Sequence, residues 1–132
     1  MKMKTLLIAL LAATPALAAK PPLDAGPAPH PGAEVYRNVC QACHMANAQG
    51  GVGAGRIPAL AGNRNLAVSG YPILVVTGGK GAMPWFRGNL SDQQIADVIN
   101  YVRGNYGNRY KDAVTAAMIA EMGVAAPVRD ER

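Results

Sequence analysis

Two cysteines and a histidine stand close together in the pentapeptide Cys40-Gln41-Ala42-Cys43-His44, and these side chains could do several kinds of chemistry. Two thiols separated by about one helical turn can each add to one vinyl group of a porphyrin, and the adjacent imidazole can bind the iron beneath the ring. This spacing is the one at which c-type haem is attached to proteins. The pentapeptide therefore predicts one covalent, iron-containing haem c, with Cys40 and Cys43 as thioethers and His44 as a metal ligand.

Three other interpretations of the cysteine pair fit the sequence less well. A thioredoxin-like redox pair belongs in a βαβ setting, and no such pattern surrounds this pentapeptide. A structural zinc site needs four nitrogen or sulfur ligands, and outside the pentapeptide the only other histidine is His30. A disulfide between the two cysteines would close almost no loop and would add little stability.

Iron bound by one histidine has a further coordination position, and we expect Met83 to fill it. This methionine lies in the stretch Gly81-Ala82-Met83-Pro84, where glycine lets the backbone approach a porphyrin and proline stiffens the chain that follows. Without Met83 on the iron, a vacant position would suit a peroxidase-like enzyme or a gas sensor. No distal histidine is evident, which weakens that alternative.

The other possible ligands are expected to have different roles. Met45 adjoins His44 and is tied to the same side of the ring. Met118 and Met122 are four residues apart on a weaker helical segment, where packing or exposure is expected. His30 lies in a proline-rich segment and is expected to be solvated.

The first 18 residues have the features of a cleavable export signal. Lys2 and Lys4 precede the apolar run 6–13, and Ala16-Leu17-Ala18 has the small-x-small pattern read by signal peptidase. The run is about half of the ~20 apolar residues that a membrane-spanning helix needs. We therefore expect residues 1–18 to be removed and the mature chain, with no membrane span, to be periplasmic.

Helices are expected to position the candidate ligands. Residues 33–42 place Val35, Tyr36 and Val39 on one helical face. A capping box at Ser91 and Gln94 opens the clearest helix, which ends near 104. The apolar residues 73–76 could be a buried strand or a short helix after an N1 proline, and residues 112–122 are a weaker helical candidate that ends before a glycine.

Glycine and proline predict the irregular segments. The mature chain starts with a proline-rich tether, 19–31, and the glycines of 50–55 are expected to exclude regular structure. A second glycine-rich loop covers 78–81. The whole chain of 132 residues has only five Tyr, one Trp and one Phe, so an ordinary apolar core would be thin, and a covalently held porphyrin could supply its centre.

From about residue 32 to residue 105 the sequence resembles the class I c-type cytochromes of the small bacterial periplasmic type. Four ordered motifs carry the resemblance: Gly32-Ala33-Glu34-Val35-Tyr36 before the pentapeptide, Ile57-Pro58-Ala59-Leu60-Ala61-Gly62, Gly81-Ala82-Met83-Pro84, and Leu90-Ser91-Asp92. The resemblance implies an all-α cytochrome c fold packed around one haem. It also implies that an N-terminal helix crosses a C-terminal helix, with Gly32 and Tyr36 against Ile99, Tyr101 and Val102.

The same resemblance implies further haem-binding residues. The carbonyl of Pro58 would accept a hydrogen bond from the far nitrogen of His44 and orient the imidazole, and Leu60 would pack on the ring. Several basic and aromatic side chains could hold the haem propionates or surround the exposed haem edge, or could be ordinary surface charges and core aromatics: Arg56, Tyr71 and Trp85, together with Arg64, Lys80 and Arg87.

The resemblance predicts electron transfer without chemical conversion of a substrate. The expected domains are a cytochrome c domain over 32–105 and a C-terminal extension over 106–132. The expected protein is a monomeric single-electron carrier between an exported flavin- or quinone-dependent dehydrogenase and a terminal oxidase or another cytochrome of the respiratory chain. A permanently bound cytochrome subunit of a dehydrogenase complex is the alternative. Removal of residues 1–18 lowers the formal charge from +5 to +3, and this mild basicity would steer the carrier towards an acidic docking patch; no nucleic-acid partner is expected.

Overall fold

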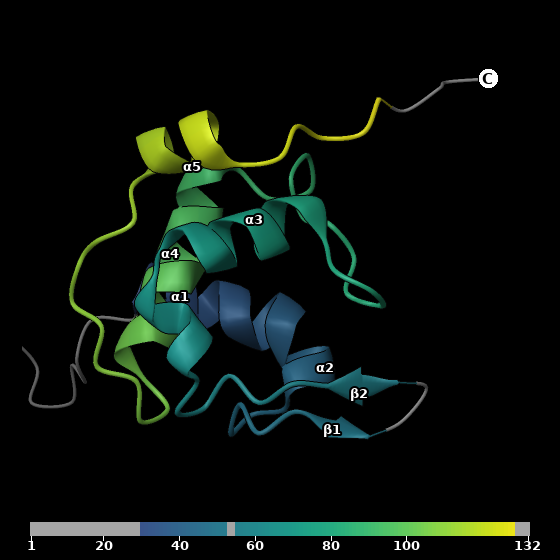
Figure 1. The fold of residues 1–132 in the computed structure, drawn as a ribbon, viewed down its shortest axis with the longest axis vertical. Coiled ribbons are helices and arrows are strands. Elements are labelled where there is room, and N and C mark those ends of the chain that lie inside the picture. Colours follow the sequence, from purple (N-terminus) through teal and green to yellow (C-terminus); the bar gives the residue numbers. More distant parts are fainter. Residues whose placement is uncertain (1–29, 53–54, 129–132) are drawn as a thin grey trace, which may run out of the picture.

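The computed structural model describes residues 30–52 and 55–128, which are mainly helical, as predicted (Figure 1). The expected export signal, most of the tether and the charged tail lie outside these residues. Among the described helices, none has the length and apolar character needed to cross a membrane. The elements are α1 (Pro31–Val35), α2 (Gln41–His44), β1 (Gly51–Val52), β2 (Arg56–Ile57), α3 (Gly70–Gly78), α4 (Asp92–Gly104) and α5 (Ala116–Met122).

The predicted helix over 33–42 is confirmed, and it extends further in both directions. Helix α1 is joined to α2 by one π-helical segment, Tyr36–Cys40. His30 is exposed, as expected, but it also caps α1, because its Nδ1 accepts a hydrogen bond from the Gly32 amide at 3.1 Å. Its ring lies 5.6 Å from that of Tyr101. Helix α1 therefore begins one residue before the expected start of the domain at residue 32.

Helices α1 and α4 cross at Gly32, where no side chain would fit. A Cβ atom on Gly32 would collide with the Asp97 carbonyl and lie 2.7 Å from Tyr101 Cβ. One turn later, Tyr36 is 1% exposed and packs in a cluster with Ala48, Leu66, Val98 and Val102. The expected crossing is present, except that Ile99 packs in a second cluster with α3 and α5.

We expect Gly32→Ala to lower the free energy of unfolding by about 3 kcal/mol, because the added methyl group forces the two helices apart. Chemical denaturation of the haem-loaded protein measures the change. Gly104→Ala is the control: it lies at the end of α4, and no atom lies within 4 Å of the place that its added methyl group would take. This second variant should keep or slightly raise stability, because alanine favours helix more than glycine does. Equal losses in the two variants would contradict the close-crossing explanation.

Helix α4 begins as the sequence predicts. Ser91 Oγ accepts from the Gln94 amide at 3.2 Å, and Gln94 Oε1 accepts from the Ser91 amide at 2.9 Å, which completes the capping box. Residues 73–76, for which the sequence allowed either a strand or a helix, are helical and belong to α3. Pro72 is the third residue of this helix, whereas the sequence placed it first. Ile73 is fully buried against α4 and α5, which makes α3 part of the core.

The C-terminal extension is folded onto the rest of the domain. Helix α5 starts later than the expected 112–122, since Thr115 caps it with a hydrogen bond from the Met118 amide. Before it, Asn100 of α4 holds the main chain of Val114 through two hydrogen bonds of 2.8 Å. Val114 and Ile119 are buried in the second cluster. Helix α5 is therefore a packed element of the domain.

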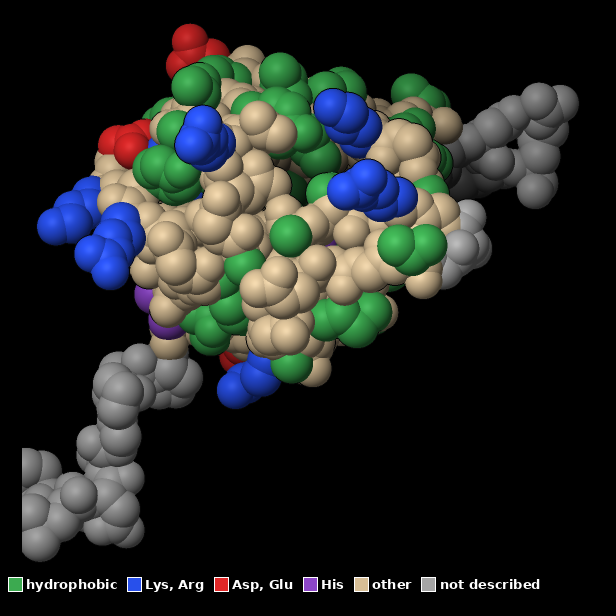
Figure 2. All heavy atoms as spheres, turned by 60° about the horizontal axis from the view of Figure 1, so that its bottom comes forward, with side chains coloured by type: hydrophobic (Ala, Val, Ile, Leu, Met, Phe, Trp, Pro, Cys, Tyr) green, Lys and Arg blue, Asp and Glu red, His purple; other side chains and the backbone are tan. Residues whose placement is uncertain are grey.

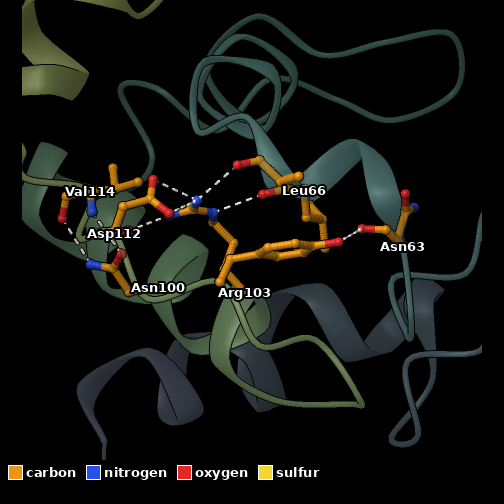
Figure 3. A network of polar contacts seen from close by, with 8 residues as sticks. Asn63, Leu66, Asn100, Arg103, Asp112 and Val114 are labelled. Atoms are coloured by element: carbon orange, nitrogen blue, oxygen red, sulfur yellow. Dashed lines mark hydrogen bonds and ion pairs between the residues drawn. The ribbon is translucent and has the colours of Figure 1, made fainter.

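A buried arginine ties the extension to two other segments (Figure 3). Arg103 is fully buried at the end of α4. Its Nε donates to the Leu66 carbonyl at 2.8 Å, one Nη donates to the Ala67 carbonyl at 3.2 Å, and the guanidinium also binds the carboxylate of Asp112 at 2.7 Å. Tyr110 lies against the guanidinium at 5.8 Å. One side chain thus joins α4, the turn before α3, and the extension.

The expectation that 50–55 lacks regular structure is wrong for its edges. Strands β1 and β2 form a short antiparallel pair, with Gly51 opposite Ile57 and Val52 opposite Arg56. Main-chain hydrogen bonds make this pairing, so it needs no apolar alternation that a sequence pattern would reveal. The pair brings the chain from α2 back to Pro58.

Candidate functional site

The pentapeptide lies at the end of the first helical segment. Cys40 is half-buried at the end of the π-helical turn, Cys43 is exposed in α2, and both thiols are free. Burial raises the pKa of the Cys40 thiol to about 11, so this thiol is protonated at neutral pH. The helical geometry places both thiols within about one turn of each other, as two thioether links to one porphyrin require.

The His44 ring is buried and oriented by one hydrogen bond. Its Nδ1 donates to the Pro58 carbonyl at 3.2 Å, which is the contact that the resemblance implies. Burial lowers the pKa of His44, and the bond to Pro58 opposes part of this shift. Burial favours the neutral ring, and the bond to Pro58 places its proton on Nδ1, which leaves the lone pair of Nε2 for a metal.

Two close approaches of the backbone set the position of Pro58. The buried Ala48 carbonyl accepts hydrogen bonds from the amides of Leu60 and Ala61 at 2.8 and 3.0 Å. Gly50 has a φ of 64°, and a Cβ there would lie 2.8 Å from the Pro58 carbonyl oxygen. The loop after α2 is therefore fixed against 57–61, and Leu60 is half-buried beside the first cluster.

Met83 stands in a tight turn at the end of α3. The Lys80 amide donates to the Met83 carbonyl, and the Met83 amide donates to the Lys80 carbonyl, each at 3.0 Å. Gly79 has a φ of 75°, and a Cβ there would lie 2.7 Å from the Met83 carbonyl. We call residues 79–86 the Met83 loop. The loop and residues next to it line a hollow of about 310 Å³.

The Met83 loop and the pentapeptide segment lie at the same edge of the molecule. In Figure 1 the loop after α3 extends towards the edge that carries α2 and the β1–β2 pair. Met45, Val52 and Trp85 are exposed large apolar side chains of these segments, and Val68, Tyr71 and Leu74, just before and in α3, are exposed as well. Together with the neutral imidazole and the glycine-lined hollow, they fit an apolar prosthetic group held between the two segments.

The basic side chains that could bind the haem propionates differ in the contacts that they make. Arg56 in β2 is exposed, and Lys80 Nζ lies 3.4 Å from the Tyr71 hydroxyl and above its ring. Arg87 is already engaged, by Asp92 at 3.4 Å and by the Val124 carbonyl at 3.2 Å. Figure 2 shows separate Lys and Arg side chains, and few acidic ones, on the face reached by turning the lower edge of Figure 1 forward.

Thr77 and Arg87 are residues that the sequence analysis did not connect with Met83. Thr77 precedes the Met83 loop and Arg87 follows it, and both bind the main chain of Val124 in the C-terminal extension. The residue types alone carry no signal of this contact, because its partners are main-chain groups far away in the sequence.

Comparisons with known proteins agree with this geometry. Residues 27–102 match the family model described as cytochrome C oxidase, cbb3-type, subunit III. The chain is 38% identical over 112 residues to the cytochrome c subunit of alcohol dehydrogenase (quinone) from Gluconacetobacter polyoxogenes, covering 74% of this chain and 24% of that subunit. It is 37% identical over 105 residues to the gluconate 2-dehydrogenase cytochrome c subunit of Pantoea cypripedii, covering 69% of this chain and 23% of that protein.

A shorter relative is matched over most of its length. Cytochrome c6 of Leptolyngbya boryana is 41% identical over 73 residues, which are 54% of this chain and 85% of that protein. By contrast, the chain spans about a quarter of the length of the two dehydrogenase subunits. The part of the chain that the family model matches, residues 27–102, contains the Cys40-x-x-Cys43-His44 motif.

Proposed function

Because this chain belongs to the cytochrome c family, whose members carry covalently bound haem c, we propose that it is a single-electron carrier that accepts electrons from an exported dehydrogenase. The observation that carries the proposal is the buried His44, held by Pro58 on one segment, with the Met83 turn at the same edge of the molecule. This arrangement offers one ligand from each side of a porphyrin and a fixed position for both.

The chain's own residues hold the group and limit how far it rearranges. Cys40 and Cys43 would form the thioethers, and His44, through Nε2, and Met83 would be the iron ligands. Haem c so held supplies an iron that takes up and releases one electron, and methionine with histidine raises its reduction potential. The Pro58 bond keeps the imidazole in place, and the Lys80–Met83 turn keeps the thioether in place, so little motion accompanies the change of charge.

Apolar and basic side chains are assigned to the surroundings of the ring. Leu60 packs on the porphyrin, and Tyr71 and Trp85 cover its edge. Arg56, Arg64 and Lys80 remain as basic candidates for binding a propionate. Arg87 is excluded from this role in the proposal because Asp92 and Val124 already bind it.

The donor is proposed to be a quinone- or flavin-dependent dehydrogenase, and the acceptor a terminal oxidase or another cytochrome. The support is that the two longer relatives are named as cytochrome c subunits of dehydrogenases. Residues 1–18 are proposed to direct export to the periplasm and to be removed there. The mature carrier would include the tether over 19–31, the cytochrome c domain over 32–105 and the extension over 106–132.

Stopped-flow mixing tests this function. We expect a reduced quinone-dependent alcohol dehydrogenase to reduce the oxidised haem-loaded protein with saturable kinetics, because the two proteins form a complex before the electron moves. The net positive charge predicts that the rate falls as salt is added, since salt screens steering towards an acidic patch. Reduction no faster than by free quinol would contradict the proposed donor. A cytochrome that remains bound to the dehydrogenase through purification would favour the permanent-subunit alternative.

A further inference from the structure

The main chain that follows α5 contacts both ends of the Met83 loop. We propose that residues 123–126, the C-terminal strap, hold this loop closed and thereby keep Met83 in position. The inference deepens the proposed function, since it assigns positioning residues to the ligand that the proposal places on the iron. The contacts that hold the loop are hydrogen bonds and packing between residues of this chain.

The first end of the loop is held through Thr77. Its hydroxyl is fully buried at the last turn of α3 and donates to the Ile73 carbonyl at 2.6 Å. The same oxygen accepts a hydrogen bond from the Val124 amide at 2.9 Å. The next residue, Gly78, leaves the space that Val124 occupies, because a Cβ there would lie 2.7 Å from a methyl group of Val124.

The second end of the loop is held through Arg87. One Nη of its guanidinium donates to the Val124 carbonyl at 3.2 Å, and the other donates to Asp92 at the start of α4 at 3.4 Å. Beyond Arg87, Ala126 Cβ lies 3.5 Å from the position that a Cβ on Gly88 would take. A single residue of the strap, Val124, therefore binds both ends of the loop with its amide and its carbonyl.

The Met83 loop has its own internal turn, but the contacts at its two ends are what hold the loop against the domain. The Lys80–Met83 turn closes the tip, and the Phe86 amide donates to the Val76 carbonyl of α3 at 2.9 Å. For Met83 to leave the iron as a unit with this turn, the two ends must separate from α3. The strap opposes that separation, so it lowers the population of the open form, in which the loop has moved away from α3. A ligand that competes with Met83 for the iron binds only this open form, and its apparent affinity falls with that population.

Thr77→Val tests the strap, because valine keeps the shape of threonine and leaves the Val124 amide without its acceptor. In the haem-loaded protein, we expect hydrogen exchange of the Lys80, Met83 and Phe86 amides to become about tenfold faster. Imidazole should bind the oxidised protein about tenfold more tightly, since the open form is more populated. Arg87→Met, which removes the second contact, should change both quantities in the same direction.

Asn100→Ala is the matched control. It cuts the hydrogen bonds between α4 and Val114, so it loosens the same extension at a place that does not contact the Met83 loop. We expect it to lower global stability while leaving the exchange rates of the loop amides, measured relative to those of Val98 and Ile99 in α4, unchanged. If it accelerates the loop as much as Thr77→Val does, the strap has no specific role and the proposal is overturned.

The same experiment separates this proposal from the proposed function. Unchanged loop exchange in both Thr77→Val and Arg87→Met would overturn the strap, whatever ligand the iron has. If the unmodified protein lacks the far-red absorption of methionine sulfur on oxidised haem, the ligand assignment fails. The exchange rates would still show whether the strap restrains the loop.

Discussion

Replacing Met83 with alanine should abolish the weak far-red absorption band of the oxidised protein and should open the iron to rapid binding of carbon monoxide after reduction. The reason is that alanine has no atom that can bind iron, while the Lys80–Met83 turn consists of main-chain bonds that alanine can keep. Loss of the band should be complete. Absorption spectra of both oxidation states and carbon monoxide mixing measure the effect.

Met118→Ala is the matched control, because it also removes a methionine. Met118 is partly buried against the cluster of α3, α4 and α5, so its loss should reduce stability while leaving the far-red band intact. An unmodified protein that is high-spin, or that binds carbon monoxide quickly at neutral pH, would contradict the carrier mechanism. That result would favour the five-coordinate haem enzyme or gas sensor.

Arg103→Met should lower the free energy of unfolding by about 3 kcal/mol, a loss as large as that expected for Gly32→Ala. The ion pair is a small part of this loss, because the Asp112 side chain is 65% exposed and solvent screens the pair. The main cost is that the Leu66 and Ala67 carbonyls lose their donor. Denaturant unfolding at neutral pH, with the haem attached, measures the loss.

Asp112→Asn separates the two contributions, since it removes only the charge. Arg103 lowers the pKa of the Asp112 carboxyl through their hydrogen bond. A carboxyl with a lowered pKa contributes stability above its unfolded pKa, and that contribution disappears as the pH falls through the folded pKa. The stability difference between the unmodified protein and Asp112→Asn should therefore be small at neutral pH and vanish in acid. A loss as large as that of Arg103→Met would contradict the assignment to the carbonyls.

Local signals predicted the elements that depend on local contacts. The capping box of α4 needs only Ser91 and Gln94, which are close in the sequence, and it is present. The residues 73–76 are all apolar and so show no periodicity, and burial of Ile73 against α4 and α5 decides for helix. The β1–β2 pair was missed because the two residues of β1, Gly51 and Val52, are too few to show a side-chain pattern, and main-chain hydrogen bonds between the two strands form the pair.

Some parts of the candidate site could be predicted from the sequence, and others could not. The types and spacing of Cys40, Cys43 and His44 identify the chemistry, and the resemblance supplied the contact with Pro58. Arg103 reads as a surface charge in the last turn of a helix, but its spacing from the buried Ala96 and Ile99 places it on the inner face. Its carbonyl partners, like the link from Val124 to Thr77, depend on how distant segments pack and leave no mark in the residue types.

The contact between Val124 and the loop ends also bears on the order in which the protein matures. Val124 follows every other group of the site in the chain, so during synthesis it is added after Cys40, Cys43, His44 and Met83. Its bonds to Thr77 and Arg87 can form only when all of these residues have been made. Until synthesis reaches Val124, the Met83 loop therefore lacks the contacts that join its two ends to the C-terminal extension.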